Sequence, residues 1–422
     1  MGEIHGVENY YNLSREKWWA SSNTFKLKID KIGYFQKKKR EKELDKLIDT
    51  VIKHIKSFPN SEVEKKQWKG KVDKFLRELM KKDKLFKLEN FDEDLKEKFF
   101  NSTEYFIKAS REFDKKLRLE DIGQAMRNVW IINILQAVMG EEVSLTKAIF
   151  GYSMLYPYTD NYLDDTTIDI NEKNKFNNRL QERLKGENIS YNNNQEAQVY
   201  KLVENIEEVF PRKKYPKVYE SLLQINNGQI RSLEQQEKVT IPYDKDILGI
   251  SILKGGSSVL VDGYLVRGEL TPEEIEFCIG YGFLLQLGDD LQDVKEDLKN
   301  NHITLMSQLA GKYYLDTISN KLINFTVNLV DNLKCKNKEN EDGLKELIKN
   351  NCIMLILFSI ALSKEYFSKE YVKTIEEYLP FTIEYLENLK IKIGKKFEEM
   401  EGGQENKGER LMNILDEVVS LG

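Results

Sequence analysis

Apolar residues along this chain recur every three or four positions, the spacing of an amphipathic α-helix. Leu44, Ile48, Val51 and Ile55 give a clear example, an apolar stripe among lysines and acidic residues. No segment keeps the alternation of a half-buried strand, no internal repeat is evident, and seven prolines in 422 residues leave long segments without a helix breaker. The pattern predicts an all-α protein built from long helices.

Changes in composition divide these predicted helices into two regions. Residues 1–112 are predicted to form an extra region of charged helices, joined at 57–61 and near Asp83, and residues 113–422 a helical bundle. Three features are expected inside the second region: an asparagine-rich loop with a short helix over 166–195, amphipathic helices over 314–400, and a last helix at about 409–420.

Charge and hydropathy exclude several classes of protein. The net charge is -5, and the lysine-rich segment 36–90 is expected to form a solvated helix face and not a nucleic-acid site. The longest apolar run, residues 353–362, is far shorter than the roughly 20 residues of a membrane-spanning helix. The first residues lack a secretory signal pattern, and the three cysteines never form a CxxC pair. We therefore expect a cytoplasmic protein without a transmembrane segment, with peripheral membrane contact and homodimerisation left open.

Two stretches without charge, residues 148–159 and 277–288, each end in a group of aspartates. The first group is Asp160, Asp164 and Asp165, and the second is Asp289, Asp290, Asp293 and Asp297. Spacings of four place several of these carboxylates on one helix face, where they repel one another unless a cation is bound. Carboxylates without nearby His or Cys favour Mg²⁺ or Mn²⁺ over zinc, and Mg²⁺ commonly bridges to phosphates. The two groups therefore predict a metal-dependent site for a phosphorylated ligand, and the alternative for either group alone is an acidic helix end at the surface.

The order of five features resembles that of the class I isoprenoid synthases over residues of about 120–310. Asp289-Asp290-Leu-Gln-Asp293 is a DDxxD sequence and resembles the second aspartate-rich motif of trans-prenyl diphosphate synthases. Asp160-Asn-Tyr-Leu-Asp164-Asp165 is similar to the first motif, with the order altered to DxxxDD. Arg127, the pair Gly228-Gln229 and Lys254-Gly-Gly-Ser stand where that family has its basic, GQ and lysine motifs.

The resemblance implies a bundle of long helices around a deep apolar cavity, with both acidic groups at its mouth. It implies that three Mg²⁺ ions, with Mn²⁺ as an alternative, bind the diphosphate of an allylic prenyl diphosphate. The implied catalytic residues are Asp160, Asp164, Asp289 and Asp293, with Asp165, Asp290 and Asp297 as further metal ligands. The implied diphosphate contacts are Arg127, Lys254, Gln229 and Lys295, and the candidate cavity lining is Phe150, Tyr152, Tyr156, Tyr264 and Phe283, because aromatic faces stabilise cations.

One departure from the family pattern favours a terpene synthase, a lyase that ionises one substrate. Enzymes that elongate with isopentenyl diphosphate carry an arginine pair after the first motif, whereas Asp165 is followed here by Thr-Thr-Ile-Asp. Two alternatives remain open: a prenyltransferase that elongates or couples prenyl chains, and a non-catalytic partner subunit. The prenyl chain length and the product skeleton are not predicted.

Overall fold

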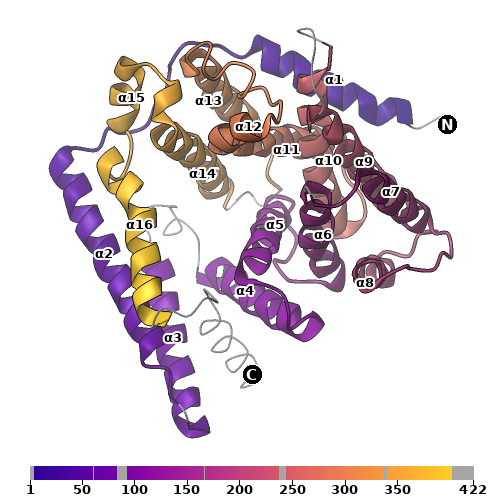
Figure 1. Ribbon diagram of the computed structural model, residues 1–422, viewed down its shortest axis with the longest axis horizontal. Coiled ribbons are helices and arrows are strands. Elements are labelled where there is room, and N and C mark those ends of the chain that lie inside the picture. The colour runs from indigo at the N-terminus through magenta and orange to yellow at the C-terminus, as the bar shows by residue number, and fades with distance from the viewer. Residues whose placement is uncertain are drawn as a thin grey trace.

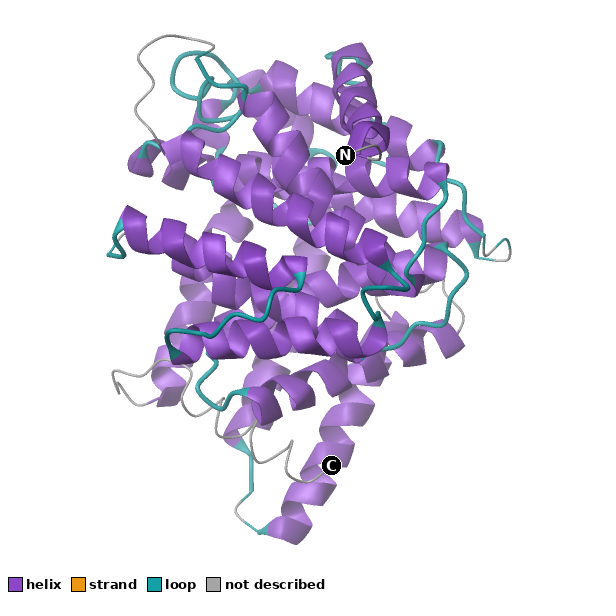
Figure 2. Ribbon diagram, turned by 90° about the vertical axis from the view of Figure 1, so that its right-hand side faces the viewer, coloured by secondary structure: helices purple, strands orange, loops and turns teal. Residues whose placement is uncertain are grey.

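The structure, a computed structural model, describes residues 4–59, 61–82, 93–165, 167–236, 244–336, 338 and 340–401. Within these ranges the regular structure is entirely helical and contains no strand, which confirms the all-α prediction (Figure 2). The helices of the first half are α1 (Ile4–Ala20), α2 (Tyr34–Lys56), α3 (Glu62–Lys82), α4 (Glu93–Phe113), α5 (Leu119–Val138), α6 (Lys147–Asp164), α7 (Ile170–Lys185), α8 (Asn194–Val209), α9 (Pro216–Ser232) and the 3₁₀ turn η2 (Leu233–Gln236). The second half contains α10 (Ile247–Arg267), α11 (Pro272–Gln292), α12 (Val294–Asn300), α13 (Asp316–Asp331), α14 (Glu341–Leu362), η3 (Lys364–Tyr366), α15 (Lys369–Glu376) and α16 (Ile383–Glu401).

Polar residues at the helix ends explain where the central helices begin. The Thr146 hydroxyl accepts a hydrogen bond from the Ile149 amide at the start of α6, and the Asp246 carboxylate accepts one from the Gly249 amide at the start of α10. Thr271 and Glu274 form a capping box at the start of α11. Such caps satisfy amides that have no partner within the helix.

The helices α10 and α11 form a hairpin at the centre of the molecule (Figure 1). Both are buried over most of their length, and they meet where Gly255 and Gly256 face Gly282. A Cβ atom built on Gly282 would lie 1.9 Å from the Gly255 carbonyl oxygen, so a side chain there would push the two helices apart. Around this pair, α9, α5 and α1 contact α10, while α13, α14 and α1 contact α11.

The N-terminal helix α1 packs on the outside of this central pair. The Tyr11 hydroxyl lies 2.9 Å from the Ser257 hydroxyl on α10, and Arg15 pairs with Asp246 at the start of that helix. Trp18 is buried, with its ring edge-on to Phe283 of α11 and to Phe325 of α13. Part of the predicted 1–112 region therefore contacts the helices of the 113–422 region directly.

Helices α2, α3 and α16 lie together at one side of the molecule (Figure 1). Ile52 and Ile55 of α2 form a small core that includes Trp68 of α3, separate from the main core. Glu41 of α2 accepts hydrogen bonds from the amide and hydroxyl of Thr382, at the start of α16. These contacts join the predicted N-terminal region to the last described helix.

One of the predicted connections agrees with the structure. The predicted joint at 57–61 lies between α2 and α3, whereas the joint near Asp83 and the helix at about 409–420 fall outside the described residues. The segment 166–195 contains α7, a 16-residue helix and so longer than the short one expected, because Phe176, Leu180 and Leu184 form a buried stripe. None of the described helices combines the length and apolar character required to cross a membrane.

Candidate functional site

The second acidic group lies at the end of α11, across a break between two helices. Helix α11 ends at Gln292, and Asp293 is both its C-cap and the N-cap of α12. The Asp293 amide bonds the Asp289 carbonyl at 2.9 Å, and the Asp297 amide bonds the Asp293 carbonyl at 2.9 Å. These bonds maintain the helical spacing across the break, as the spacing of four predicts.

Two carboxyls of this group, Asp289 and Asp293, have raised pKa values. Solvent reaches the Asp289 side chain, but protein surrounds it closely, and this desolvation, helped by the charge on Asp293, raises the pKa of Asp289 to about 6. Desolvation also raises the pKa of Asp293, with further contributions from Asp297 and Glu296. Carboxyls with raised pKa values in a shared site are typical of positions that bind a cation.

Asp290 and Asp297 face other partners. Asp290 is buried and accepts a hydrogen bond from Gln286 at 2.9 Å, and burial raises its pKa to about 7. Asp297 is also buried, with its carboxylate 3.4 Å from His302 Nδ1 and 3.3 Å from the Thr304 hydroxyl that donates to it. The structure therefore turns these two carboxylates toward protein groups, whereas Asp289 and Asp293 remain accessible to solvent.

Two cations lie beside the second acidic group. The positive charge of Arg127, on α5, partly offsets the rise in the pKa values of Asp289 and Asp293. The charge of Lys254, on α10, partly offsets the rise for Asp289 and Asp290. Within the described part of the chain, neither cation has a salt-bridge partner within 4.0 Å. Lys295, by contrast, is exposed and forms a 2.8 Å salt bridge with Glu365.

The first acidic group occupies the last turn of α6 and the residue after it. Asp160 is half-buried and accepts a hydrogen bond from the Gln229 side chain on α9. Asp164 is the last residue of α6, and its side chain is outside the described part of the structure. Asp165 is exposed and accepts hydrogen bonds from the Thr167 hydroxyl and amide, which lower its pKa.

The helices α9 and α10, each of which has a residue that interacts with one acidic group, contact each other at neighbouring positions. A Cβ atom at Gly228 would lie 3.1 Å from the Lys254 Cα, so these helices approach closely at that point. The next residue on α9, Gln229, bonds Asp160, while the Lys254 charge acts on Asp289. Five residues that sequence reasoning selected, Arg127, Asp160, Gln229, Lys254 and Asp289, are therefore brought into one region of the molecule.

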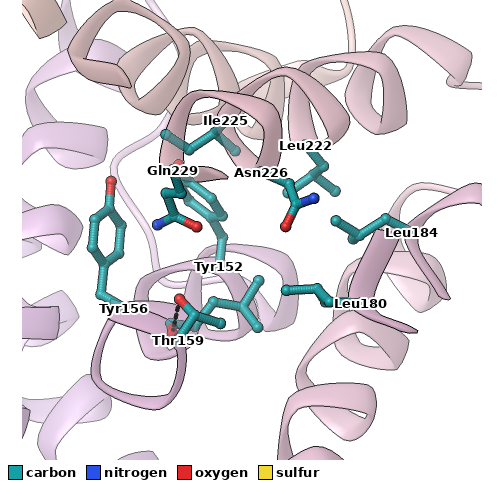
Figure 3. A pocket seen from close by; sticks show the side chains of 10 residues that line it. Tyr152, Tyr156, Thr159, Leu180, Leu184, Leu222, Ile225, Asn226 and Gln229 are labelled. Atoms are coloured by element: carbon teal, nitrogen blue, oxygen red, sulfur yellow. Dashed lines mark hydrogen bonds between the residues drawn. The ribbon is translucent and has the colours of Figure 1, made fainter. Parts of the chain in front are cut away.

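A small cavity lies next to Asp160, between α6, α7 and α9 (Figure 3). Its volume is about 30 Å³, and its lining is mostly apolar. The lining residues are Tyr152, Leu155, Tyr156, Thr159, Leu180, Leu184, Leu222, Ile225, Asn226 and Gln229. This volume accommodates about one water molecule.

Two of the five predicted cavity aromatics line this cavity, namely Tyr152 and Tyr156. The structure places the other three elsewhere. Phe150 packs against Phe106 and Phe113 of α4, and Phe283 packs against Trp18 and Phe325. Tyr264 lines a separate groove, of about 690 Å³, beside α1.

Sequence reasoning missed the α7 and α9 residues of the cavity. Leu180 and Leu184 fall in the segment expected to be mainly loop, although their spacing with Phe176 is that of a helical stripe. Asn226 stands three residues before Gln229, so both side chains lie on one face of α9, and that spacing was an available signal.

A buried acid behind the cavity was also missed. Asp262 of α10 is fully buried and accepts a 2.9 Å hydrogen bond from Asn128 of α5. Burial raises its pKa well above the usual range, and its charge would act on Tyr152 and Tyr156. Burial therefore favours the protonated form of this carboxyl, since the charged form would be desolvated.

The donor set of the region suits a hard divalent cation with few protein ligands. Within the described residues, no three His, Cys, Asp or Glu side chains form a ready-made metal cluster. Mg²⁺ requires no such cluster, because it is commonly bound by one or two carboxylates together with water and substrate phosphates. The accessible Asp289 and Asp293, with raised pKa values and no neutralising salt bridge among the described residues, fit that mode of binding.

Comparison with known proteins did not identify a relative. The chain matched no family model, no curated protein and no solved structure.

Proposed function

We propose that this chain is a Mg²⁺-dependent class I terpene synthase that ionises an allylic prenyl diphosphate to a carbocation and releases diphosphate. The observation that supports the proposal is that Lys254 lies close to the second acidic group and against the helix that bonds the first. Its backbone lies against Gly228, next to the Gln229 side chain that bonds Asp160, and its charge acts on Asp289. A diphosphate bound at Lys254 would then be close to metal ions held by carboxylates of both α6 and α11.

Arg127 and Lys254 would bind the diphosphate directly. Both cations lack a salt-bridge partner among the described residues, so a phosphate oxygen could take that place without breaking an existing pair. Their attraction for the diphosphate grows as negative charge develops on the leaving oxygen, and this lowers the barrier to ionisation. Lys295, held by Glu365, is not included in this set.

Asp289 and Asp293 on one side, with Asp160 on the other, would hold the metal ions. Mg²⁺, when bound, supplies Lewis-acid neutralisation of the diphosphate charge. Gln229 would orient the Asp160 carboxylate through their hydrogen bond, while the Asp289 backbone is fixed in the last turn of α11. Asp164 belongs to the same group by its position in the sequence.

Tyr152 and Tyr156 would line the path of the hydrocarbon. They lie on α6 two turns and one turn before Asp160, and aromatic faces stabilise a cation without reacting as strong nucleophiles. Since the cavity holds about 30 Å³, a prenyl chain could enter only if Leu180 and Leu184 of α7 move away from α9. Ligand-binding cavities of this class are expected to exceed about 300 Å³.

The decisive experiment is incubation of the purified full chain with Mg²⁺ and allylic diphosphates of several lengths, followed by mass spectrometry. Each diphosphate is supplied alone and with isopentenyl diphosphate. We expect product and free diphosphate from one allylic substrate alone. Growth of the chain only with isopentenyl diphosphate would instead identify a prenyltransferase, and no reaction under any condition would contradict the proposal.

The double variant Asp289→Asn with Asp293→Asn tests the metal-binding group. We expect turnover to fall at least about 100-fold while helical content is unchanged, because the side chains keep their size and lose their charge. Asp30→Asn, at an exposed position far along the chain from both groups, is the matched control and should retain wild-type turnover. Equal turnover in all three proteins would remove the second acidic group from the proposed site.

A further inference from the structure

The cavity beside Asp160 contains one buried polar side chain that no protein group satisfies. Asn226 is 2 % exposed, and neither its Nδ2 nor its Oδ1 has a hydrogen-bond partner among the described residues. Figure 3 shows its carboxamide directed into the space between α6, α7 and α9. A buried carboxamide with both ends unsatisfied costs the free energy of its lost hydration, so a ligand that satisfies it is favoured.

The size and the lining of the cavity limit the ligand that Asn226 can hold. A volume of about 30 Å³ is enough for about one water molecule and is too small for a prenyl chain unless α7 moves. A carboxamide can both donate to water and accept from it, and the Gln229 side chain on the next turn of α9 lies in the same lining. The surrounding leucines and isoleucine offer no competing hydrogen bond to a water molecule at this position.

From this geometry we infer that the cavity binds a single water molecule through Asn226, and that this water is the nucleophile that ends the proposed reaction. The second half of the inference rests on the proposed function. The cavity adjoins Asp160 through Thr159 and Gln229, so the water lies beside the acidic group that would hold the metal-bound diphosphate. The product class is then a terpene alcohol and not a hydrocarbon.

The chemistry balances without a further reagent. Ionisation breaks the bond between carbon and the diphosphate oxygen, and the electron pair leaves with the diphosphate. A lone pair of the water oxygen then forms a new carbon–oxygen bond with the carbocation. The resulting oxonium loses one proton to the released diphosphate, which leaves a neutral alcohol. Asn226 is a positioning residue in this step, because its carboxamide orients the water and transfers no proton.

Isotope labelling tests the role of the water in the full-length enzyme. In H₂¹⁸O with Mg²⁺ and the allylic diphosphate that the enzyme accepts, we expect an alcohol that carries one ¹⁸O atom. Asn226→Leu, which fills the cavity with an apolar side chain, should lower the ratio of alcohol to hydrocarbon at least about tenfold while the substrate is still consumed. Asn177→Leu is the matched control, because Asn177 is also 2 % exposed and unsatisfied but does not line this cavity, and the product ratio should not change.

The outcomes separate this inference from the proposed function. An active enzyme that yields hydrocarbon alone overturns the inference and leaves the terpene synthase proposal intact. A protein inactive with every allylic diphosphate overturns the proposed function and the catalytic half of the inference with it. A crystal structure of the full chain decides the remaining half, since density for a water bonded to Asn226 supports the site and a dry cavity rejects it. If Asn226→Leu does not fold, the wild-type labelling and the crystal structure still decide both halves.

Discussion

The side chain of Gln229, on α9, donates a hydrogen bond to the carboxylate of Asp160, on α6. The two residues are separated by α7 and α8 in the chain, yet this bond fixes the carboxylate beside the small cavity and beside the α9–α10 contact at Gly228. The bond connects the first acidic group to α9, which contacts α10, the helix that carries Lys254.

Gln229→Leu tests whether this bond positions Asp160 for catalysis. We expect turnover to fall about tenfold to 100-fold, as is typical when the residue that orients a metal ligand is lost. Steady-state kinetics with varied Mg²⁺ should show an increased metal requirement. Gln224→Leu, on the same helix but facing Tyr11, is the control and should leave the metal requirement unchanged. Equal Mg²⁺ dependence in both variants would contradict the positioning role.

Lys254→Met tests the proposed diphosphate contact. The substitution removes the charge but keeps a long apolar side chain, so α10 should remain packed. We expect turnover to fall about 100-fold or more, because a cation that stabilises the leaving group is lost. Lys299→Met, at an exposed position on α12, should retain wild-type turnover. The proposal for Lys254 fails if its variant matches this control.

Gly282→Ala tests the close contact between α10 and α11. The added Cβ atom would lie 1.9 Å from the Gly255 carbonyl oxygen, which is backbone and cannot rotate away. We expect the free energy of unfolding to fall by about 1–3 kcal/mol, measured by urea denaturation, and turnover to fall because Lys254 shifts relative to Asp289. Gly70→Ala, at an exposed position of α3 with open space around it, should instead stabilise the protein by about 0.5–1 kcal/mol.

Mg²⁺ should stabilise the wild-type protein even without substrate. Desolvation, with a contribution from neighbouring carboxylates, raises the pKa values of Asp289 and Asp293, so a bound cation is favoured in the folded state. Thermal unfolding should occur at a higher temperature in millimolar Mg²⁺ than in EDTA, and the difference should disappear in the Asp289→Asn, Asp293→Asn double variant. A shift of the same size in wild type and double variant would place the binding of Mg²⁺ elsewhere.

Asp262→Asn should change how stability depends on pH. Burial raises the pKa of Asp262 in the folded state, so below pH of about 4 the carboxyl is protonated in both states and the two proteins should be similar. As pH rises, the Asp262 carboxyl ionises first in the unfolded state. The free energy of unfolding of the wild type therefore falls until the pH reaches the raised pKa of Asp262 in the folded state. The asparagine variant, whose carboxamide oxygen can still accept the bond from Asn128, does not lose this stability. Urea denaturation at pH 5 and pH 8 should show a larger advantage of the variant at pH 8, and a constant difference would exclude the buried carboxyl as the cause.

The sequence predicted the helical class and the position of the acidic groups at helix ends because these depend on local patterns. The spacing of Asp289 and Asp293 after an uncharged stretch predicted carboxylates at a helix end, and the structure places them there. It did not predict that α11 ends at Gln292, because the backbone hydrogen bonds that continue across the break carry no side-chain signature.

Other features depend on contacts between distant segments, which spacing alone does not determine. Phe283 and Tyr156 both follow a helical apolar pattern. Phe283 packs against Trp18, more than 250 residues away in the chain, whereas Tyr156 lines the small cavity and its hydroxyl contacts Ser258 of α10. The unsatisfied Asn226 is likewise evident only once the leucines of α7 are placed opposite it. Whether the two acidic groups act together remains a prediction that the experiments above decide.

The packing of α1 has a consequence for how this chain is made. Trp18 is synthesised more than 250 residues before its partners Phe283 and Phe325. Trp18 of α1 therefore stays unburied until α13 has been synthesised. We expect the central hairpin to complete its folding only after that point. A truncated chain that begins after α1 would expose the rings of Phe283 and Phe325. A loss of activity in such a chain would therefore be caused by aggregation and not by the loss of a catalytic residue.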